Sequence, residues 1–317
     1  MRSHEWRIIT RPADAGGRAD LPVSHPPLPT PRKRSCPAVD ITGDKSFFRA
    51  TLPLDWSVAK PNSIELPDCE PIPILFEDRS VLAIDKPRGW MLVPYSWQKT
   101  SWNLMAAITS SIAAGDFWAR SRGLKFLRNV HRLDADTSGI LLFAKSIGSV
   151  NVISDLFESR QMEKTYLAVV TGQPPQTEWL CQFKLGPDPK KFGRVKVDFR
   201  DGRIAETNFK ILETRGQFTL IEAKPVTGRT HQIRVHLAEC GLPIVGDELY
   251  GRLETDLPLG LRAVRLGFMN PFTKQRVDIR APTEGFLQRY GFSPATGIPP
   301  APRPPNLKTR PGSSGAK

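Results

Sequence analysis

The sequence predicts an α+β protein whose core is a mixed, largely antiparallel β-sheet. Short apolar segments with the composition of strands outnumber the segments with helical periodicity. The helical segments fall between the strands without the regular alternation that a parallel βαβ fold requires. No internal repeat is visible. We therefore expect one large α+β domain, or two abutting lobes.

Apolar and β-branched residues mark the predicted strands. The run Ile140-Leu141-Leu142-Phe143 is continuous and apolar, which is typical of a buried strand. Two further short strands flank a predicted turn at residues 77–80. The full set of predicted strands comprises residues 74–76, 81–84, 140–143, 164–170, 207–212, 218–223 and 263–268.

Helical periodicity predicts helices at residues 104–114 and 146–162. In the second segment, apolar residues recur at the spacing i, i+3, i+6 and i+7, which places them on one face of a helix. These residues are Val150, Ile153, Leu156 and Phe157. We expect this face to pack on the sheet.

Both ends of the chain are rich in proline and lack apolar periodicity. Seven prolines lie within residues 1–45 and seven more within residues 294–317. Such segments bury too little apolar surface to offset the entropy of ordering, so we expect two disordered tails. Prolines also interrupt residues 46–71, which we expect to form an irregular lead-in too short for a further helical domain. The predicted folded domain is residues 72–293.

The formal net charge of +13 favours a polyanionic partner, because each phosphate that a protein neutralises releases counterions. Charge of this kind also serves solubility alone, and it does not distinguish transfer RNA from ribosomal RNA. The scattered cysteines have no paired spacing and favour a reducing compartment. They are Cys36, Cys69, Cys181 and Cys240.

No apolar run reaches membrane-spanning length, and the first residues lack the apolar core of a secretory signal. Acidic residues and prolines near the N-terminus also argue against a transit peptide. We expect a cytoplasmic protein. We also expect a monomer, because no exposed apolar stripe marks an interface.

Residues 131–139, His-Arg-Leu-Asp-Ala-Asp-Thr-Ser-Gly, are the most informative segment of the chain. If the first four residues are extended, Arg132 and Asp134 point to one side, and His131 and Leu133 to the other. A carboxylate beside a guanidinium, just before a core strand, suits either a catalytic site or an ordinary ion pair. The segment alone leaves both readings open.

Residues 131–139 resemble the catalytic loop of the RluA-type pseudouridine synthases, whose pattern is His-Arg-Leu-Asp-x-x-Thr-Ser-Gly. Residues 163–168 resemble the Lys-x-Tyr segment of that family, and residues 228–237 resemble its third motif. Gly246-Asp247 and Tyr250-Gly251 continue the match. Three motifs in the order of the family, spread over about 120 residues, exclude a chance match.

The resemblance covers roughly residues 72–282 and implies the pseudouridine synthase fold, a bent mixed sheet flanked by helices with the active cleft across its middle. It also implies that the protein converts uridines in structured ribosomal or transfer RNA to pseudouridine. The uracil is detached from C1′, turned and rejoined through C5. This reaction is redox-neutral and gives an isomer of the substrate, so we expect RNA as the partner, no cofactor and no metal.

Asp134, Arg234 and Tyr166 are the expected catalytic residues. C1′ becomes electron-poor during the reaction, so a carboxylate must lie close to it, and Asp134 is the candidate. Whether it adds to the sugar or to the base stays open. Arg234, on a helix predicted from Thr230 to about Cys240, is expected to grip Asp134 with two hydrogen bonds. The resemblance implies that Tyr166 sits over the base, where it stacks or takes the C5 proton.

Four basic residues are expected to bind the substrate. A uridine must leave its stack to be modified, and Arg132 is expected to fill that space or to bind a phosphate. Arg229 and His231, beside the cleft, are candidates for phosphate contacts, and Lys86 is a further candidate.

Other chemistries find little support in the sequence. Asp134 and Asp136 near His131 suggest metal ligands, but nothing completes the set, and His231 and His236 lie five residues apart rather than four. A Gly-x-Ser-x-Gly elbow, a phosphate-binding loop and a second marked carboxylic acid are absent.

The alternative in a different class is a catalytically silent protein that binds or folds RNA on the same scaffold. The presence of Asp134, Tyr166 and Arg234 favours the enzyme.

Overall fold

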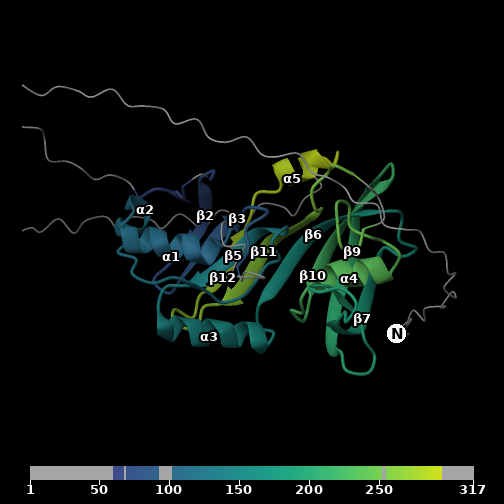
Figure 1. The fold of residues 1–317 in the computed structure, drawn as a ribbon, viewed down its shortest axis with the longest axis horizontal. Helices are drawn as coiled ribbons and strands as arrows, with labels where there is room; N and C mark the ends of the chain where they lie inside the picture. Colours follow the sequence, from purple (N-terminus) through teal and green to yellow (C-terminus); the bar gives the residue numbers. More distant parts are fainter. Residues whose placement is uncertain (1–59, 68, 93–101, 252–254, 295–317) are drawn as a thin grey trace, which may run out of the picture. The chain divides into compact units, whose positions relative to one another are not determined.

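The computed structural model describes residues 60–67, 69–92, 102–251 and 255–294, and these form a twelve-stranded sheet with five helices (Figure 1). The strands are β1 (Ser63–Ile64), β2 (Ile72–Glu77), β3 (Val81–Lys86), β4 (Arg128–Asn129), β5 (Ser138–Ala144), β6 (Glu163–Thr171), β7 (Glu178–Pro187), β8 (Val195–Val197), β9 (Arg203–Arg215), β10 (Phe218–Pro225), β11 (Leu261–Met269) and β12 (Arg276–Arg280). The helices are α1 (Leu104–Ala114), α2 (Phe117–Arg120), α3 (Ile147–Glu158), α4 (Gln232–Glu239) and α5 (Glu284–Arg289).

The order of the strands brings distant segments together at the middle of the sheet. The order is β1-β2-β3-β5-β11-β6-β10-β9-β7-β8, with β12 beside β11 and β4 beside β5. Pairings between the named strands are antiparallel except for the one between β5 and β11, which is parallel. This mixed, mostly antiparallel sheet confirms the predicted α+β class.

Gly139 is required where β5 meets β11. Its φ is +109°, and a Cβ atom at this position would lie 2.1 Å from the carbonyl oxygen of Ala263. Only glycine allows this close approach of the two backbones. The glycine that ends residues 131–139 therefore joins that segment to the central strands.

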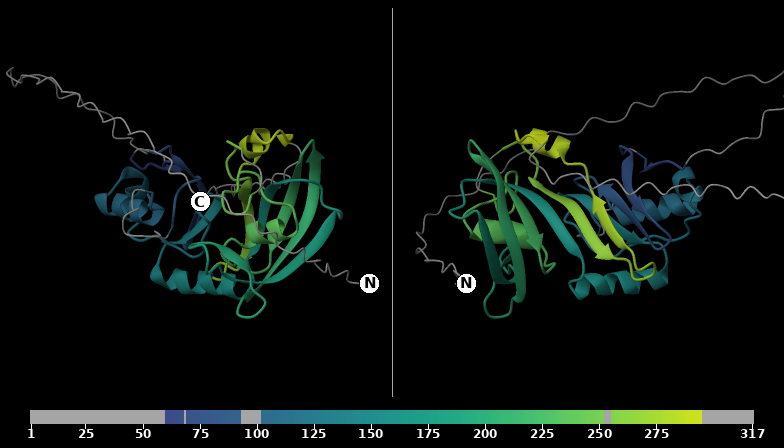
Figure 2. Two further views of the ribbon diagram at one scale, coloured as in Figure 1. Left: turned by 45° about the vertical axis from the view of Figure 1, so that its right-hand side comes forward. Right: turned by 180° about the vertical axis from the view of Figure 1, so that it is seen from behind.

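Helices cover the sheet on separate apolar clusters. Trp118 of α2 and Leu104 and Ile108 of α1 pack with residues of β3 and β5. Ile153 of α3 belongs to a second cluster, with β5, β11 and β12. Helix α4 packs over β7, β8, β9 and β10, which curve around it in Figure 2. Ile233 is one of the residues that α4 buries in this cluster.

Most predicted elements are present, although their ends differ. The helix at 104–114 has the predicted bounds, whereas the helix predicted at 146–162 ends at Glu158 because Arg160 adopts φ +61°. Strands β7, β8 and β12 and helix α5 were not predicted. Strand β7 lies at the surface, where exposed and buried residues alternate without an apolar run.

The predicted domain limits are only partly covered by the described residues. Strand β1 lies within the lead-in predicted to be irregular at 46–71, and it pairs with β2. Residues 1–45 and 295–317, predicted to be tails, lie outside the described residues. Among the residues that the structure describes, no helix is long and apolar enough to span a membrane.

Candidate active site

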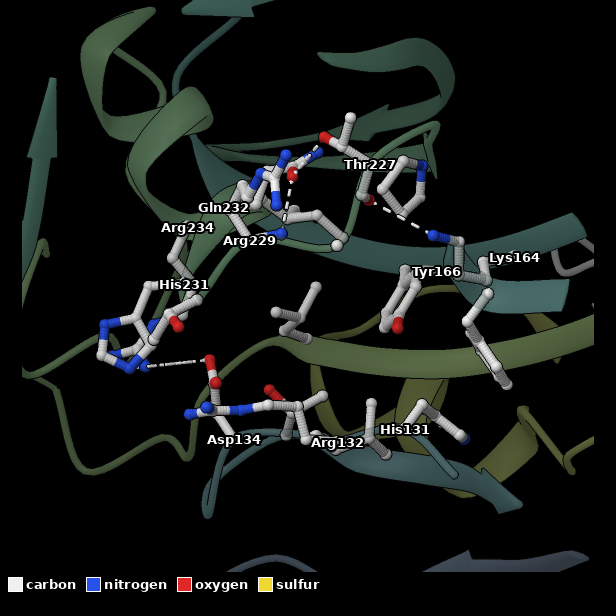
Figure 3. Close-up of a pocket in the computed structure, with 18 of the residues that line it drawn as sticks. His131, Arg132, Asp134, Lys164, Tyr166, Thr227, Arg229, His231, Gln232 and Arg234 are labelled. Carbon is white, nitrogen blue, oxygen red and sulfur yellow. Dashed lines mark hydrogen bonds and ion pairs between the residues drawn. The ribbon is translucent and has the colours of Figure 1, made fainter. Parts of the chain in front are cut away.

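The predicted catalytic residues lie together in one pocket of about 370 Å³. It is formed by the segment before β5, by the end of α3, by the start of β6 and by the loop that leads from β10 into α4 (Figure 3). Its size suits a single nucleotide unit. The pocket is lined, among others, by His131, Arg132, Asp134, Phe157, Arg160, Lys164, Tyr166, Thr227, Arg229, His231, Gln232 and Arg234.

Asp134 and Arg234 form the predicted ion pair, but not with the predicted geometry. Nη1 of Arg234 lies 3.4 Å from Oδ2 of Asp134 (Figure 3). The two-pronged grip goes to Asp247 instead, with Nε to Oδ2 at 2.8 Å and Nη2 to Oδ1 at 2.7 Å. The expectation that Arg234 grips Asp134 with two hydrogen bonds was therefore wrong. Nη1 of Arg234 faces Asp134 in the pocket, while Nε and Nη2 bind Asp247 and hold the arginine in place.

Asp247 is a site residue to which the sequence assigned no role. Its side chain is fully buried, and its Oδ1 also accepts hydrogen bonds from the backbone of Leu249 and Tyr250. The Tyr250 ring lies 5.3 Å from the guanidinium carbon of Arg234, within reach of a cation–π contact. The only sequence signal was the segment Gly246-Asp247 with Tyr250-Gly251, which extended the family match.

His231 is buried rather than placed to bind a phosphate. It is 5 % exposed, its Nδ1 lies 3.0 Å from the Tyr250 hydroxyl, and its Nε2 lies 3.8 Å from Oδ2 of Asp134. Burial lowers the pKa of His231, although the charge of Asp134 opposes this shift. His231, with φ +53°, occupies the cap position before α4, so this helix begins at Gln232 and not at Thr230 as predicted. The predicted phosphate contact was wrong.

Tyr166 lies between the two ends of the pocket in Figure 3. Burial, and then the negative charge of Asp134, raises the pKa of Tyr166 above its usual value. The phenol therefore stays protonated at neutral pH. Tyr166 and Asp134 line the same pocket, and the role of Tyr166 at the base stays a prediction.

Lys86 does not contact the substrate, and this prediction was wrong. Its side chain is 0 % exposed, and its ammonium donates to the carbonyl oxygens of Pro87 (3.0 Å), Ala135 (2.7 Å) and Thr137 (3.0 Å). Burial lowers the pKa of Lys86 to about 8, while Asp136 and then Asp134 oppose the shift. The lysine thus ties the turn after β3 to the backbone of Ala135 and Thr137, just after Asp134.

Arg132 and Arg229 are exposed and line the pocket, and their binding of RNA stays a prediction. Leu133 is buried in the core between Arg132 and Asp134, which agrees with an extended segment. Nε of Arg229 donates to the carbonyl oxygen of Ile204, 3.1 Å away. Both guanidinium groups remain available at the surface for RNA.

His131 supports the structure through contacts with β5 and α3. Its Nε2 accepts a hydrogen bond from the Leu142 N–H at 2.9 Å, and its ring stacks on Phe157 at 4.6 Å. Burial, and then the charge of Lys164, lowers the pKa of His131 to about 3. The histidine is therefore neutral. Among the described residues, no group of three or more His, Cys, Asp or Glu side chains is placed to hold a metal ion.

Lys164, Thr227 and Gln232 also line the pocket, although the sequence assigned them no role. Gln232 orders the loop before α4: its Oε1 accepts from Thr227 Oγ1 at 2.6 Å and from the Arg229 N–H at 3.0 Å. Its Nε2 donates to the carbonyl oxygen of Glu206 at 2.9 Å. Lys164 and Gln232 fall inside the family motifs, and this was the one signal that could have identified them.

Known proteins are similar to this one in sequence and in fold. The sequence profile of the RNA pseudouridylate synthase family matches residues 80–239. An uncharacterized RNA pseudouridine synthase of Chloroflexus aurantiacus is 41 % identical over 162 residues, which cover 50 % of this chain and 51 % of that protein. Ribosomal large subunit pseudouridine synthase C of Yersinia pestis is 36 % identical over 233 residues, which cover 70 % and 68 %.

A solved structure shows the same fold. Human RNA pseudouridylate synthase domain containing 1 matches with a TM-score of 0.54 and 23 % sequence identity, over 67 % of this chain and 84 % of that one. The predicted fold and family are thereby confirmed. The protein belongs to the RNA pseudouridylate synthase family, the isomerases that its three motifs predict.

Proposed function

We propose that this protein converts uridines of large-subunit ribosomal RNA to pseudouridine, with Asp134 acting at C1′ of a uridine flipped into the pocket. The observation that carries the proposal is the Asp134 carboxylate in the pocket, 3.4 Å from a guanidinium that is itself fixed. A base must leave the helix to reach such a site. The name of the relative in Yersinia pestis supports ribosomal RNA as the substrate.

The residues around Asp134 divide the remaining work. Arg234 stabilises the negative charge of the carboxylate, and Tyr166 lies against the base as a protonated phenol. Arg132 and Arg229, both exposed at the rim, bind the backbone or fill the space that the flipped base leaves. Action on ribosomal RNA implies the cytoplasm as the compartment.

The test is release of tritium from unmodified large-subunit ribosomal RNA transcripts labelled at uracil C5. Rejoining the base through C5 displaces this hydrogen, so wild-type protein releases tritium to water. Asp134→Asn, which keeps the shape and removes the charge, is expected to bind the same transcript and release none. Release by the variant at the wild-type rate would exclude Asp134. RNA binding without release by either protein would favour the catalytically silent alternative.

A further inference from the structure

Lys164 lies at the end of the pocket opposite Asp134. It precedes Tyr166 by two residues on β6, so both side chains extend from the same face of the strand. Figure 3 shows Tyr166 between the Asp134 carboxylate and the Lys164 ammonium. A uracil whose sugar lies at Asp134 and whose ring lies over Tyr166 therefore points its far edge at Lys164.

The Lys164 ammonium retains donors for a ligand. An ammonium carries three N–H groups, and among the described residues it makes one hydrogen bond, to the carbonyl oxygen of Thr227 at 3.2 Å. Its charged neighbour is Arg160, a second cation. Burial, and then Arg160, lowers the pKa of Lys164 to about 8. Among the described residues, Lys164 forms no ion pair with a carboxylate, although Glu158 also lines this pocket. A half-buried cation in this position is stabilised by a ligand that supplies acceptor atoms.

The Thr227 carbonyl oxygen is held firmly next to this ammonium. The hydroxyl of Thr227 donates to Gln232 at 2.6 Å and accepts from the Glu206 N–H at 3.0 Å. The pocket thus presents a fixed acceptor beside a donor. Uracil has the complementary pair, a carbonyl oxygen next to N3–H. Cytosine carries an amino group where uracil has O4, and it lacks the N3 hydrogen. Its amino group would therefore face the Lys164 ammonium, a second donor, and its N3 would face the Thr227 oxygen, a second acceptor.

We propose that Lys164 and the Thr227 carbonyl oxygen recognise the uracil of the flipped nucleotide. The ammonium donates to a ring carbonyl oxygen, and the Thr227 oxygen accepts from N3–H. When the N1–C1′ bond breaks, its electron pair stays with the base and spreads onto the carbonyl oxygens, where the same ammonium stabilises it, while the Asp134 carboxylate compensates the electron-poor C1′. A bond from C5 to C1′ then forms and C5 loses its proton to water. N1, which no longer carries the sugar, takes up a proton, so the product is an isomer of uridine. This inference rests on the proposed function and names a further residue for it.

The experiment compares Lys164→Met, Lys164→Arg and Arg160→Met by single-turnover tritium release from the same ribosomal RNA transcript. Each variant yields a rate constant at saturating protein and the protein concentration that gives half of this rate, between pH 6 and 9.5. Arg160→Met is the matched control, because it removes an exposed cation from the same end of the pocket. Thermal unfolding shows which variants are folded.

Lys164→Met is expected to lower the rate constant on the order of 100-fold, the effect of removing one donor from a developing charge, and to leave the half-saturating concentration within about threefold. Arg160→Met is expected to raise the half-saturating concentration while the rate constant changes little. The wild-type rate should fall above pH 8 as the ammonium deprotonates, whereas the Lys164→Arg rate should not, because arginine stays charged. This comparison of the pH profiles of wild type and Lys164→Arg tests the role of Lys164 even if Lys164→Met does not fold.

Three results would overturn the inference. The first is a wild-type rate constant for Lys164→Met. The second is a change in the half-saturating concentration of Lys164→Met alone, as expected for a phosphate contact. The third is a loss of Lys164→Arg activity above pH 8 like that of wild type. Failure of the proposed function looks different, because wild-type protein itself would then release no tritium.

Discussion

Arg234 is held in place by Asp247, a residue that does not line the pocket. The two side chains share hydrogen bonds of 2.8 and 2.7 Å, and both are buried. This grip leaves Nη1 of Arg234 to reach Asp134. The position of the cation at the active site is therefore set from behind, by a carboxylate that also accepts from the turn at Leu249 and Tyr250.

Asp247→Asn is expected to lower both stability and activity. The amide cannot compensate the buried guanidinium charge, so the free energy of unfolding should fall by about 3 kcal/mol. The rate constant for tritium release should fall at least about tenfold, because Arg234 is no longer anchored. Asp278→Asn is the control, since its partners Arg265 and Arg280 are partly exposed. It should cost less than about 1 kcal/mol. An unchanged rate in Asp247→Asn would show that Arg234 needs no such anchor.

Lys86→Met should destabilise the segment after Asp134 without changing the salt dependence of RNA binding. The variant leaves three carbonyl oxygens without their donor, and the free energy of unfolding should fall by about 3 kcal/mol. Urea denaturation measures this loss. A lysine that contacted a phosphate would instead reduce the slope of log affinity against log salt by about 1. Such a reduction would contradict the internal role of Lys86.

His236→Leu is expected to stabilise the protein, and more so at pH 5 than at pH 8. His236 is fully buried, and both of its ring nitrogens lack a hydrogen-bond partner among the described residues. Burial lowers the pKa of His236 from 6.5 to about 4. Between these values the unfolded chain binds more protons, so stability falls as the pH drops from 6.5 towards 4. Leucine removes this loss. Thermal unfolding at both pH values tests it, and an equal gain at both would contradict the role of protonation.

Arg160→Gly should separate RNA binding from stability. Arg160 ends α3 with φ +61°, a conformation that favours glycine, so the variant should gain up to about 1 kcal/mol. Loss of its charge from the rim should weaken binding of the ribosomal RNA transcript and reduce the salt slope by about 1. Lys274→Gly is the matched control, with φ +57° in the turn between β11 and β12. It should gain stability alone. Equal RNA affinities for the two variants would exclude Arg160 from the interface.

The sequence predicted the parts of the site that depend on local chemistry. Residues 131–139, the Lys-x-Tyr segment and residues 228–237 identified Asp134, Tyr166 and Arg234, and the structure places all three in one pocket. The central strands were also predictable, because β3, β5, β6 and β11 are largely buried and β3, β5 and β6 contain continuous apolar runs. Surface strands such as β7 lack this signal, since only alternate residues face the core.

By itself, the sequence determined the α+β class, the family and the residues that carry the chemistry, because these follow from residue types at fixed spacing. Only the tertiary structure decided the partners of the charged groups. Lys86 and His231 were expected at the RNA surface, yet they are buried against the segment of Asp134 and against Tyr250. Arg234 makes its two short hydrogen bonds to Asp247 rather than to Asp134. A charge is paired by whatever the fold brings within about 4 Å, and that depends on strand order rather than on neighbours in the chain.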